Sequence, residues 1–115
     1  MSAPLDEQQY YERASATLHE LLDVLDELSQ NSNEAFEVEF ANDILTLDFP
    51  DGVRFVINSH RAARQIWMAA NTSAWHFNWH ADVQQWLCSK SSANLWQVVT
   101  EQLSRKLGKT IALKR

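Results

Sequence analysis

The chain has 115 residues, with 15 acidic and 10 basic side chains and a formal net charge of -5. A chain of this length forms one domain with a sizeable core, so we expect a single domain over residues 1–115. The negative charge argues against nucleic acid as a partner, because phosphate binding needs a basic patch. No apolar run approaches the roughly 20 residues that span a bilayer, so we expect no membrane segment.

Cysteine content and the N-terminal residues both favour a reducing cytoplasm as the location. Cys88 is the only cysteine, which excludes an internal disulfide and any multi-cysteine zinc or iron–sulfur site. Residues 1–7 are acidic and lack the apolar core of a secretory signal. We therefore expect a cytoplasmic protein.

Apolar residues at three- and four-residue steps predict a first helix from about residue 7 to Leu28. Asp6 and Gln9 have the spacing of a capping box at its start. The helix-poor run Ser29–Asn33 predicts a turn after its end. The expected apolar stripe is Tyr11, Ala14, Leu18, Leu21, Leu22, Leu25 and Leu28. Such a stripe needs an apolar surface to lie on.

Short alternating runs then predict an antiparallel meander. The expected strands cover residues 36–40, 44–49, 53–58, 65–70, 74–79 and 85–88. Asn42-Asp43 and Pro50-Asp51-Gly52 provide the first two turns, because these residue types suit tight turns. The connection between the third and fourth strands contains His60. In the fourth strand, Ile66 flanks Trp67, and a core-facing Ile66 turns Trp67 to the open side of the sheet.

A second helix is predicted from Leu95 to Leu107. Asn94 and Gln97 fit a capping box at its start, and Gly108 is placed to end it. The order of elements favours an α+β two-layer sandwich, with the N- and C-terminal helices on one face of an antiparallel sheet of about six strands. The other face of the sheet then meets water or a partner.

Acidic residues continue from the first helix into the first strand. They are Glu20, Asp23, Asp26, Glu27, Glu34, Glu37 and Glu39, and no Lys or Arg occurs between residues 18 and 53. Like charges three or four residues apart on a helix repel by about 0.2–0.5 kcal/mol per pair. A bound cation or a basic partner would reduce this repulsion. Exposed carboxylates suit Fe²⁺, Mn²⁺, Mg²⁺ or Ca²⁺, bound weakly because no rigid cage holds the ion. A merely solvated acidic face is the alternative.

Histidines offer a second kind of ligand. His19 lies one helical turn before Asp23, and we hypothesise that it supplies a nitrogen ligand to a transition metal; the alternative is an exposed histidine without a role. His76 and His80 would lie about 13 Å apart on an extended strand, too far to share one ion. No nucleophile elbow, phosphate-binding Gly-rich loop or HExxH helix occurs, so we do not expect an enzyme.

In these features the chain resembles the frataxin family in its bacterial form. The resemblance rests on the acidic first helix from Tyr11 to Leu28, the strand Ile44-Leu-Thr-Leu47, the strand ending at Asn58, and Gln65-Ile-Trp67 followed by a tryptophan-bearing strand pair. It covers nearly the whole chain. It implies a small accessory protein of iron–sulfur cluster assembly that binds Fe²⁺ or Fe³⁺ weakly at its surface. It also implies cysteine desulfurase and iron–sulfur scaffold protein as partners, with iron delivery or rate regulation as the role.

Carried over by position, the resemblance places Glu20, Asp23, Asp26, Glu27 and Glu37 in the iron- and partner-binding ridge. It assigns Asn58 and Trp67 to partner contact on the open sheet face, and we add His60 and Gln65 to that candidate set. Where the family often has Gln, two residues after the position of Asn58, this chain has His60. We expect a monomer and leave metal-driven oligomers open. The alternatives are a metal-independent acidic adaptor and a ferroxidase, which needs a paired iron site.

Overall fold

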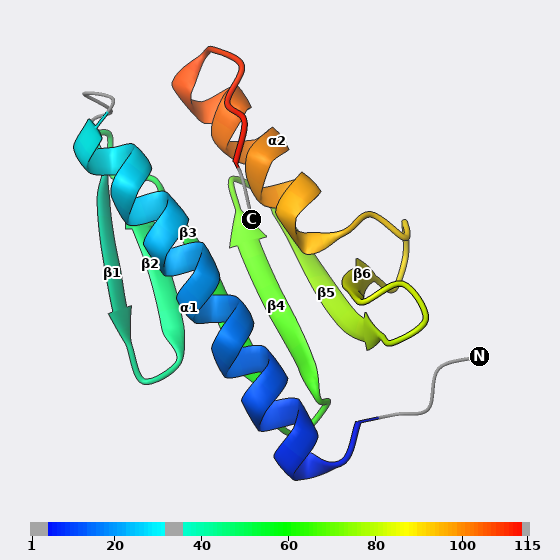
Figure 1. Cartoon of the computed structure of the whole chain (residues 1–115). Helices are drawn as coiled ribbons and strands as arrows, with labels where there is room; N and C mark the ends of the chain where they lie inside the picture. Colours follow the sequence, from blue (N-terminus) through cyan, green and yellow to red (C-terminus); the bar gives the residue numbers. More distant parts are fainter. Residues whose placement is uncertain (1–4, 32–35, 114–115) are drawn as a thin grey trace.

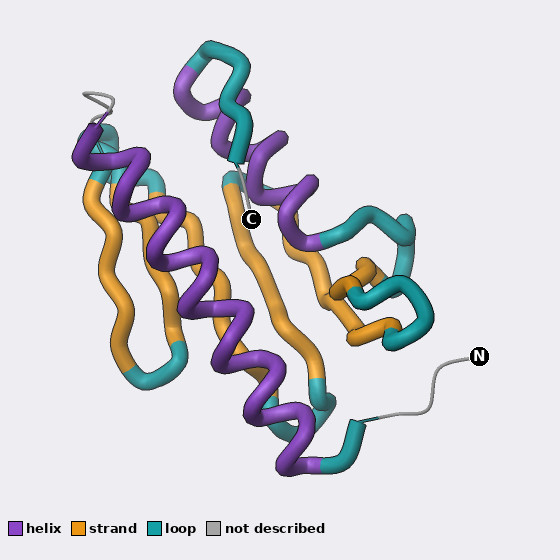
Figure 2. Tube along the Cα trace, in the orientation of Figure 1, coloured by secondary structure: helices purple, strands orange, loops and turns teal. Residues whose placement is uncertain are grey.

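A computed structural model describes residues 5–31 and 36–113, in which two helices lie on the same face of a sheet (Figure 1). The elements are α1 Glu7–Asn31, β1 Glu37–Ala41, β2 Ile44–Asp48, β3 Arg54–His60, β4 Gln65–Ala70, β5 Ser73–His80, β6 Gln85–Cys88 and α2 Leu95–Leu107. The strands form one sheet in chain order, and every neighbouring pair is antiparallel. This confirms the predicted α+β two-layer sandwich, whose two layers Figure 2 separates by colour. Neither helix of the described part is long and apolar enough to cross a membrane.

The core fills the space between the helices and the sheet. Its fully buried aliphatic and aromatic side chains include Leu18, Leu21, Leu25, Leu45, Leu47, Phe55, Ile57, Ile66, Phe77, Val99 and Leu103. Two hydrogen bonds fix α1 across the sheet. Tyr10 Oη donates to the carbonyl oxygen of Gln65 at 2.8 Å, and Trp86 Nε1 donates to Thr17 Oγ1 at 2.9 Å. These bonds set the rotation of α1 about its axis, and with it the residues that face solvent.

The prediction that Tyr11 joins the buried stripe of α1 is wrong. Tyr11 is 50% exposed, whereas its neighbour Tyr10 is 2% exposed. Tyr10 lies edge-to-face against Trp86, with ring centroids 6.3 Å apart, and burial raises the pKa of its phenol. The packing of α1 on the sheet therefore decides which of the two adjacent tyrosines is buried, and the spacing of apolar residues did not predict this choice.

The limits of β1, β2 and β5 and the start of β3 differ from the prediction by one residue, and the ends of α1 and β3 differ by more. The first helix continues through Ser29 to Asn31, where a turn was expected. The Gln30 side chain donates to both carboxylate oxygens of Asp26 at 3.3 Å, one turn back, and this contact favours the extra helical residues. β3 extends to His60, which pairs with Gln65 of β4. His60 is therefore a strand residue and does not lie in the connection.

The ends of α2 confirm the predicted signals. Asn94 has extended backbone angles, and its Oδ1 accepts a hydrogen bond from the Gln97 amide at 2.8 Å. Gly108 ends the helix in the left-handed region with a φ of 70°, a conformation that favours glycine.

Removing the cap should weaken the fold measurably. We expect Asn94→Ala to lower the free energy of unfolding by about 1 kcal/mol, because the Gln97 amide loses its acceptor. Asn94→Asp keeps an acceptor at the same position and should stay near the wild-type value. Urea unfolding of the three proteins, followed by circular dichroism, measures the difference; equal midpoints for all three would contradict a role for the cap.

Candidate functional site

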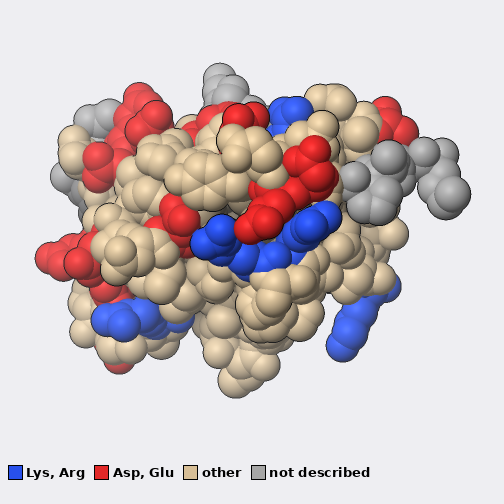
Figure 3. Space-filling model, turned by 90° about the horizontal axis from the view of Figure 1, so that it is seen from below, with Lys and Arg blue, Asp and Glu red and all other residues tan. Residues whose placement is uncertain are grey.

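The predicted acidic residues lie on two sides of the sheet edge formed by β1. On α1, Glu20, Asp23 and Glu27 are exposed and Asp26 is half-buried; we call these four residues the helix bank. On β1, Glu37 and Glu39 are exposed; we call them the strand bank. Seen from below, carboxylates recur on the side of the molecule where β1 lies (Figure 3). Glu34 lies outside the described residues.

Alternation along β1 determines where the strand bank points. Val38 and Phe40 pack against the core between the layers, so Glu37 and Glu39 face the other side of the sheet, away from α1. The helix bank and the strand bank therefore belong to opposite sides of the edge strand. A partner that contacts both banks must reach around the edge of the sheet.

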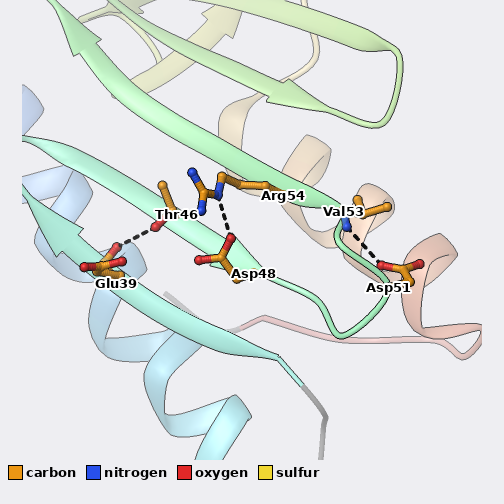
Figure 4. A network of polar contacts seen from close by, with 6 residues as sticks. All are labelled: Glu39, Thr46, Asp48, Asp51, Val53 and Arg54. Atoms are coloured by element: carbon orange, nitrogen blue, oxygen red, sulfur yellow. Dashed lines mark hydrogen bonds and ion pairs between the residues drawn. The ribbon is translucent and has the colours of Figure 1, made fainter.

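The strand bank has a basic neighbour on the outer sheet face. Arg54 Nε lies 2.6 Å from Asp48 Oδ1 on the outer face of β2 and β3 (Figure 4). Its pKa is raised, first by the hydrogen bond and charge of Asp48 and further by the charge of Glu39. By contrast, no Lys or Arg of the described residues forms an ion pair with Asp23, Asp26 or Glu27. Among the described residues, negative charge without an ion-pair partner is thus concentrated at Asp23, Asp26 and Glu27.

A further carboxylate is engaged at the β2–β3 turn. Asp51 accepts a hydrogen bond from the Val53 amide at 3.1 Å (Figure 4) and pairs with Lys106 of α2. The Lys106 hydrogen bond, followed by that of Val53, lowers the pKa of the Asp51 carboxyl. Asp51 therefore links the sheet to α2, and its charge is already balanced by a base.

His19 lies beside the helix bank with a defined orientation. Its Nδ1 is 2.8 Å from the carbonyl oxygen of Ser15, so Nδ1 carries a hydrogen and donates it. The ring meets Phe40 of β1 edge-to-face, with centroids 5.0 Å apart. This leaves Nε2 as the ring atom with a lone pair for a metal ion.

The described residues contain no group of three or more His, Cys, Asp or Glu side chains arranged to hold a metal ion. An ion on the helix bank would therefore meet one or two protein ligands and fill its remaining positions with water. Such sites are open and chemically unselective.

The four residues predicted for partner contact come together on the outer sheet face. Asn58 lies opposite Trp67, and His60 lies opposite Gln65, in the register of β3 and β4. All four are half-buried, and Trp67 Nε1 donates to Gln65 Oε1 at 2.7 Å. Ile66 on the same strand is fully buried, so Trp67 faces the open side, as predicted.

Sequence reasoning missed how histidines flank this tryptophan. The His60 ring stacks on one side of Trp67 with centroids 3.7 Å apart and an interplanar angle of 11°. The His76 ring from β5 stacks at 4.2 Å and 12°; we call these three residues the ring stack. Gln65 Nε2 also donates to Asn78 Oδ1 of β5 at 3.1 Å. Strand alternation predicts one face for these side chains, but only the register makes them neighbours.

Comparison with known proteins identifies the family of this chain. A family model described as the frataxin-like domain matches residues 3–109. The chain belongs to the frataxin family. A relative from Thioalkalivibrio sulfidiphilus, named iron-sulfur cluster assembly protein CyaY, is 32% identical over 87% of this chain and 92% of its own length. A relative from Arabidopsis thaliana, named frataxin, mitochondrial, is 28% identical over 97% of this chain, which spans 61% of that relative's length.

Solved frataxin structures share the architecture. Frataxin from Psychromonas ingrahamii superposes with a TM-score of 0.82 over 96% of this chain and 100% of its own, and at 14% identity it shows the fold alone. Trimeric frataxin from Saccharomyces cerevisiae, complexed with ferrous iron, superposes with a TM-score of 0.72 at 26% identity, over 95% of this chain and 92% of its own. The frataxin resemblance drawn from the residues is therefore confirmed.

Proposed function

We propose that this chain is an accessory protein of iron–sulfur cluster assembly that contacts a cysteine desulfurase and scaffold complex and changes its rate. The observation that carries the proposal is that Asp23, Asp26 and Glu27 of the helix bank form no ion pair with a Lys or Arg of the described residues, in a family whose bacterial members are named for cluster assembly. Residues 1–115 act as one domain and as a monomer. The chain positions an ion for the enzyme or modulates the enzyme's rate, and it catalyses no covalent step itself.

In this proposal the helix bank binds ferrous iron weakly and reversibly. Asp23 and Glu27 are one helical turn apart and exposed, so each presents hard oxygen ligands to a hydrated ion. Ferric iron and other divalent cations share these ligands. The yeast relative complexed with ferrous iron supports iron as the ion. The strand bank, Glu37 and Glu39, offers a second negative surface on the other side of the edge strand.

His19 supplies a nitrogen ligand in this proposal. Its Nε2 is free because Nδ1 is occupied by the Ser15 carbonyl oxygen. We expect His19→Ala to weaken Co²⁺ binding by about threefold to tenfold, since one nitrogen ligand is lost from a site with few protein ligands. Isothermal titration calorimetry with Co²⁺ measures the change. His80→Ala, which removes a histidine of the outer sheet face, is the control; equal affinities for wild type and His19→Ala would exclude the ligand.

The outer sheet face makes the second contact of the proposed complex. Trp67 lies half-buried on this face beside Asn58 and Gln65, and tryptophan is among the residues that most often dominate binding energy at interfaces. The strand bank lies on the same face. One partner assembly can therefore touch both Trp67 and the strand bank.

Binding with and without a chelator tests the role of the metal. If iron bridges the chain to its partners, EDTA should weaken binding to the desulfurase–scaffold complex. A metal-independent adaptor would instead bind with a salt dependence that EDTA leaves unchanged. A ferroxidase would consume oxygen stoichiometrically when Fe²⁺ is added, and substitution of the helix bank would abolish that consumption.

A further inference from the structure

A small pocket, which we call the corner pocket, lies where α1, β6 and the start of α2 meet. Its walls include Thr17 of α1, Trp79 of β5, Gln85 and Trp86 of β6, and Leu95 and Trp96 of α2. β6 is the last strand of the sheet and β1 is the first, so the corner pocket lies at the sheet edge opposite the strand bank. It is therefore distinct from the acidic edge strand that the proposed function uses.

Internal contacts hold the walls of the corner pocket in place. Trp86 Nε1 donates a hydrogen bond to Thr17 Oγ1 at 2.9 Å, which joins β6 to α1. The Trp79 ring meets the Trp86 ring with centroids 5.6 Å apart and an interplanar angle of 63°. Asn94 caps the helix on which Trp96 is the second residue. A ligand would thus meet a preformed site and pay little to order it.

The size of the corner pocket limits what it can hold. Its volume is about 110 Å³. A cavity of about 150 Å³ with apolar walls takes up benzene, whereas pockets for drug-sized ligands measure about 300–1,000 Å³. The corner pocket therefore has room for one six-membered ring and excludes a nucleotide. Walls built from three indole rings favour a planar aromatic ring over an aliphatic one.

Polar groups without an internal partner lie in and beside the pocket. The guanidinium carbon of Arg13 lies 4.4 Å from the ring centroid of Trp79. Arg13 is exposed, and no carboxylate of the described residues forms an ion pair with it. Within the same part of the chain, the side-chain amide of Gln85 and the indole N–H of Trp96 make no hydrogen bond. These groups can donate to oxygen acceptors, and a guanidinium pairs most strongly with a carboxylate.

We propose that the corner pocket binds a small aromatic carboxylate, with its single ring against the indole walls and its carboxylate paired with Arg13. A neutral ring would leave the guanidinium without an ion-pair partner, and a carboxylate without a ring would leave the indole walls uncovered. Only a ligand with both parts uses both features of the site. This inference goes beyond the proposed function, which makes no use of the corner pocket.

The test is a titration of the whole chain with benzoate, followed by ¹H–¹⁵N nuclear magnetic resonance. The chain has five tryptophans, each with one indole N–H signal, which Trp→Phe variants assign. We expect the signals of Trp79 and Trp96 to move and saturate, with a dissociation constant of about 1 mM or below. The signal of Trp67, on the opposite side of the sheet, should stay in place. Benzyl alcohol, which has the ring without the charge, should bind at least about fivefold more weakly, and acetate should not move these signals.

Two arginine variants test the carboxylate contact. Arg13→Gln removes the charge beside Trp79 and should weaken benzoate binding by about fivefold, to the affinity of benzyl alcohol. Arg105→Gln makes the same charge change at an exposed position in the last turn of α2. It should leave the dissociation constant unchanged, because Arg105 does not belong to the pocket.

Each part of the proposal has a result that overturns it. If benzoate produces no saturable movement of the Trp79 or Trp96 signal, the corner pocket is not a binding site. Equal affinities for benzoate and benzyl alcohol in the wild-type chain would overturn the carboxylate as the ligand class, whatever the variants do. Unchanged benzoate binding by folded Arg13→Gln would overturn the role of Arg13. None of these measurements involves the desulfurase–scaffold complex, so they are independent of the proposed function.

Discussion

The double variant Asp23→Lys, Glu27→Lys should weaken binding to a desulfurase–scaffold complex by about tenfold or more at low salt. Both side chains are exposed on α1, and within the described residues neither has an ion-pair partner. Reversal therefore breaks no internal contact and turns attraction toward a basic surface into repulsion. The difference between the variant and wild type should shrink as salt is added, because exposed charges are screened. Biolayer interferometry over a salt series measures both effects.

The control variant changes the net charge by the same amount as the helix-bank variant, but at residues outside the helix bank. Glu12→Lys, Glu101→Lys alters two exposed acids, one near the start of α1 and one on α2. If local charge on the helix bank guides binding, this control should lose much less affinity than the helix-bank variant. An equal loss in both variants would mean that overall charge, and not the helix bank, governs the association.

Leu21→Ala should lower the free energy of unfolding by about 3–5 kcal/mol. Leu21 is fully buried on α1 against the sheet, and truncation leaves a cavity that close-packed neighbours fill only partly. Native domains are stable by only about 5–15 kcal/mol, so this single change removes a large share of the total. Chemical denaturation with a two-state fit measures the loss.

The neighbouring Leu22 provides the matched control. Its side chain has the same size but is only half-buried, so Leu22→Ala should cost clearly less than Leu21→Ala. Similar losses for the two variants would contradict the orientation of α1 on the sheet. Both variants should still bind the partner complex below their melting temperatures, since neither residue belongs to the acidic banks.

Local signals were enough to predict most of the fold. The strands at residues 65–70 and 85–88 have the predicted limits, because alternation and turn residues mark both ends of each. The end of α1 was missed because the poor helix propensity of Ser29 is offset by the Gln30–Asp26 contact. Whether Tyr10 or Tyr11 is buried depends on how α1 is rotated on the sheet. The spacing of apolar residues within the helix does not define that rotation closely enough.

The candidate site divides in the same way. The helix bank lies within one helix, so spacing alone predicts its shared face. Arg54 lies one residue beyond the base-free stretch 18–53, and only the pairing of β2 with β3 brings it to Asp48. The sequence alone therefore did not reveal this ion pair. The ring stack joins three strands, and two registers must be known before His60 and His76 can be placed against Trp67. Contacts that depend on register were the ones that sequence reasoning did not reach.

The most direct test is the rate of iron–sulfur cluster formation by a desulfurase and scaffold pair, measured by absorbance with and without this chain. The account predicts that the wild-type chain changes this rate, that Asp23→Lys, Glu27→Lys abolishes the change, and that Glu12→Lys, Glu101→Lys preserves it. An unchanged rate with the wild-type chain, at concentrations well above micromolar, would contradict a role in cluster assembly.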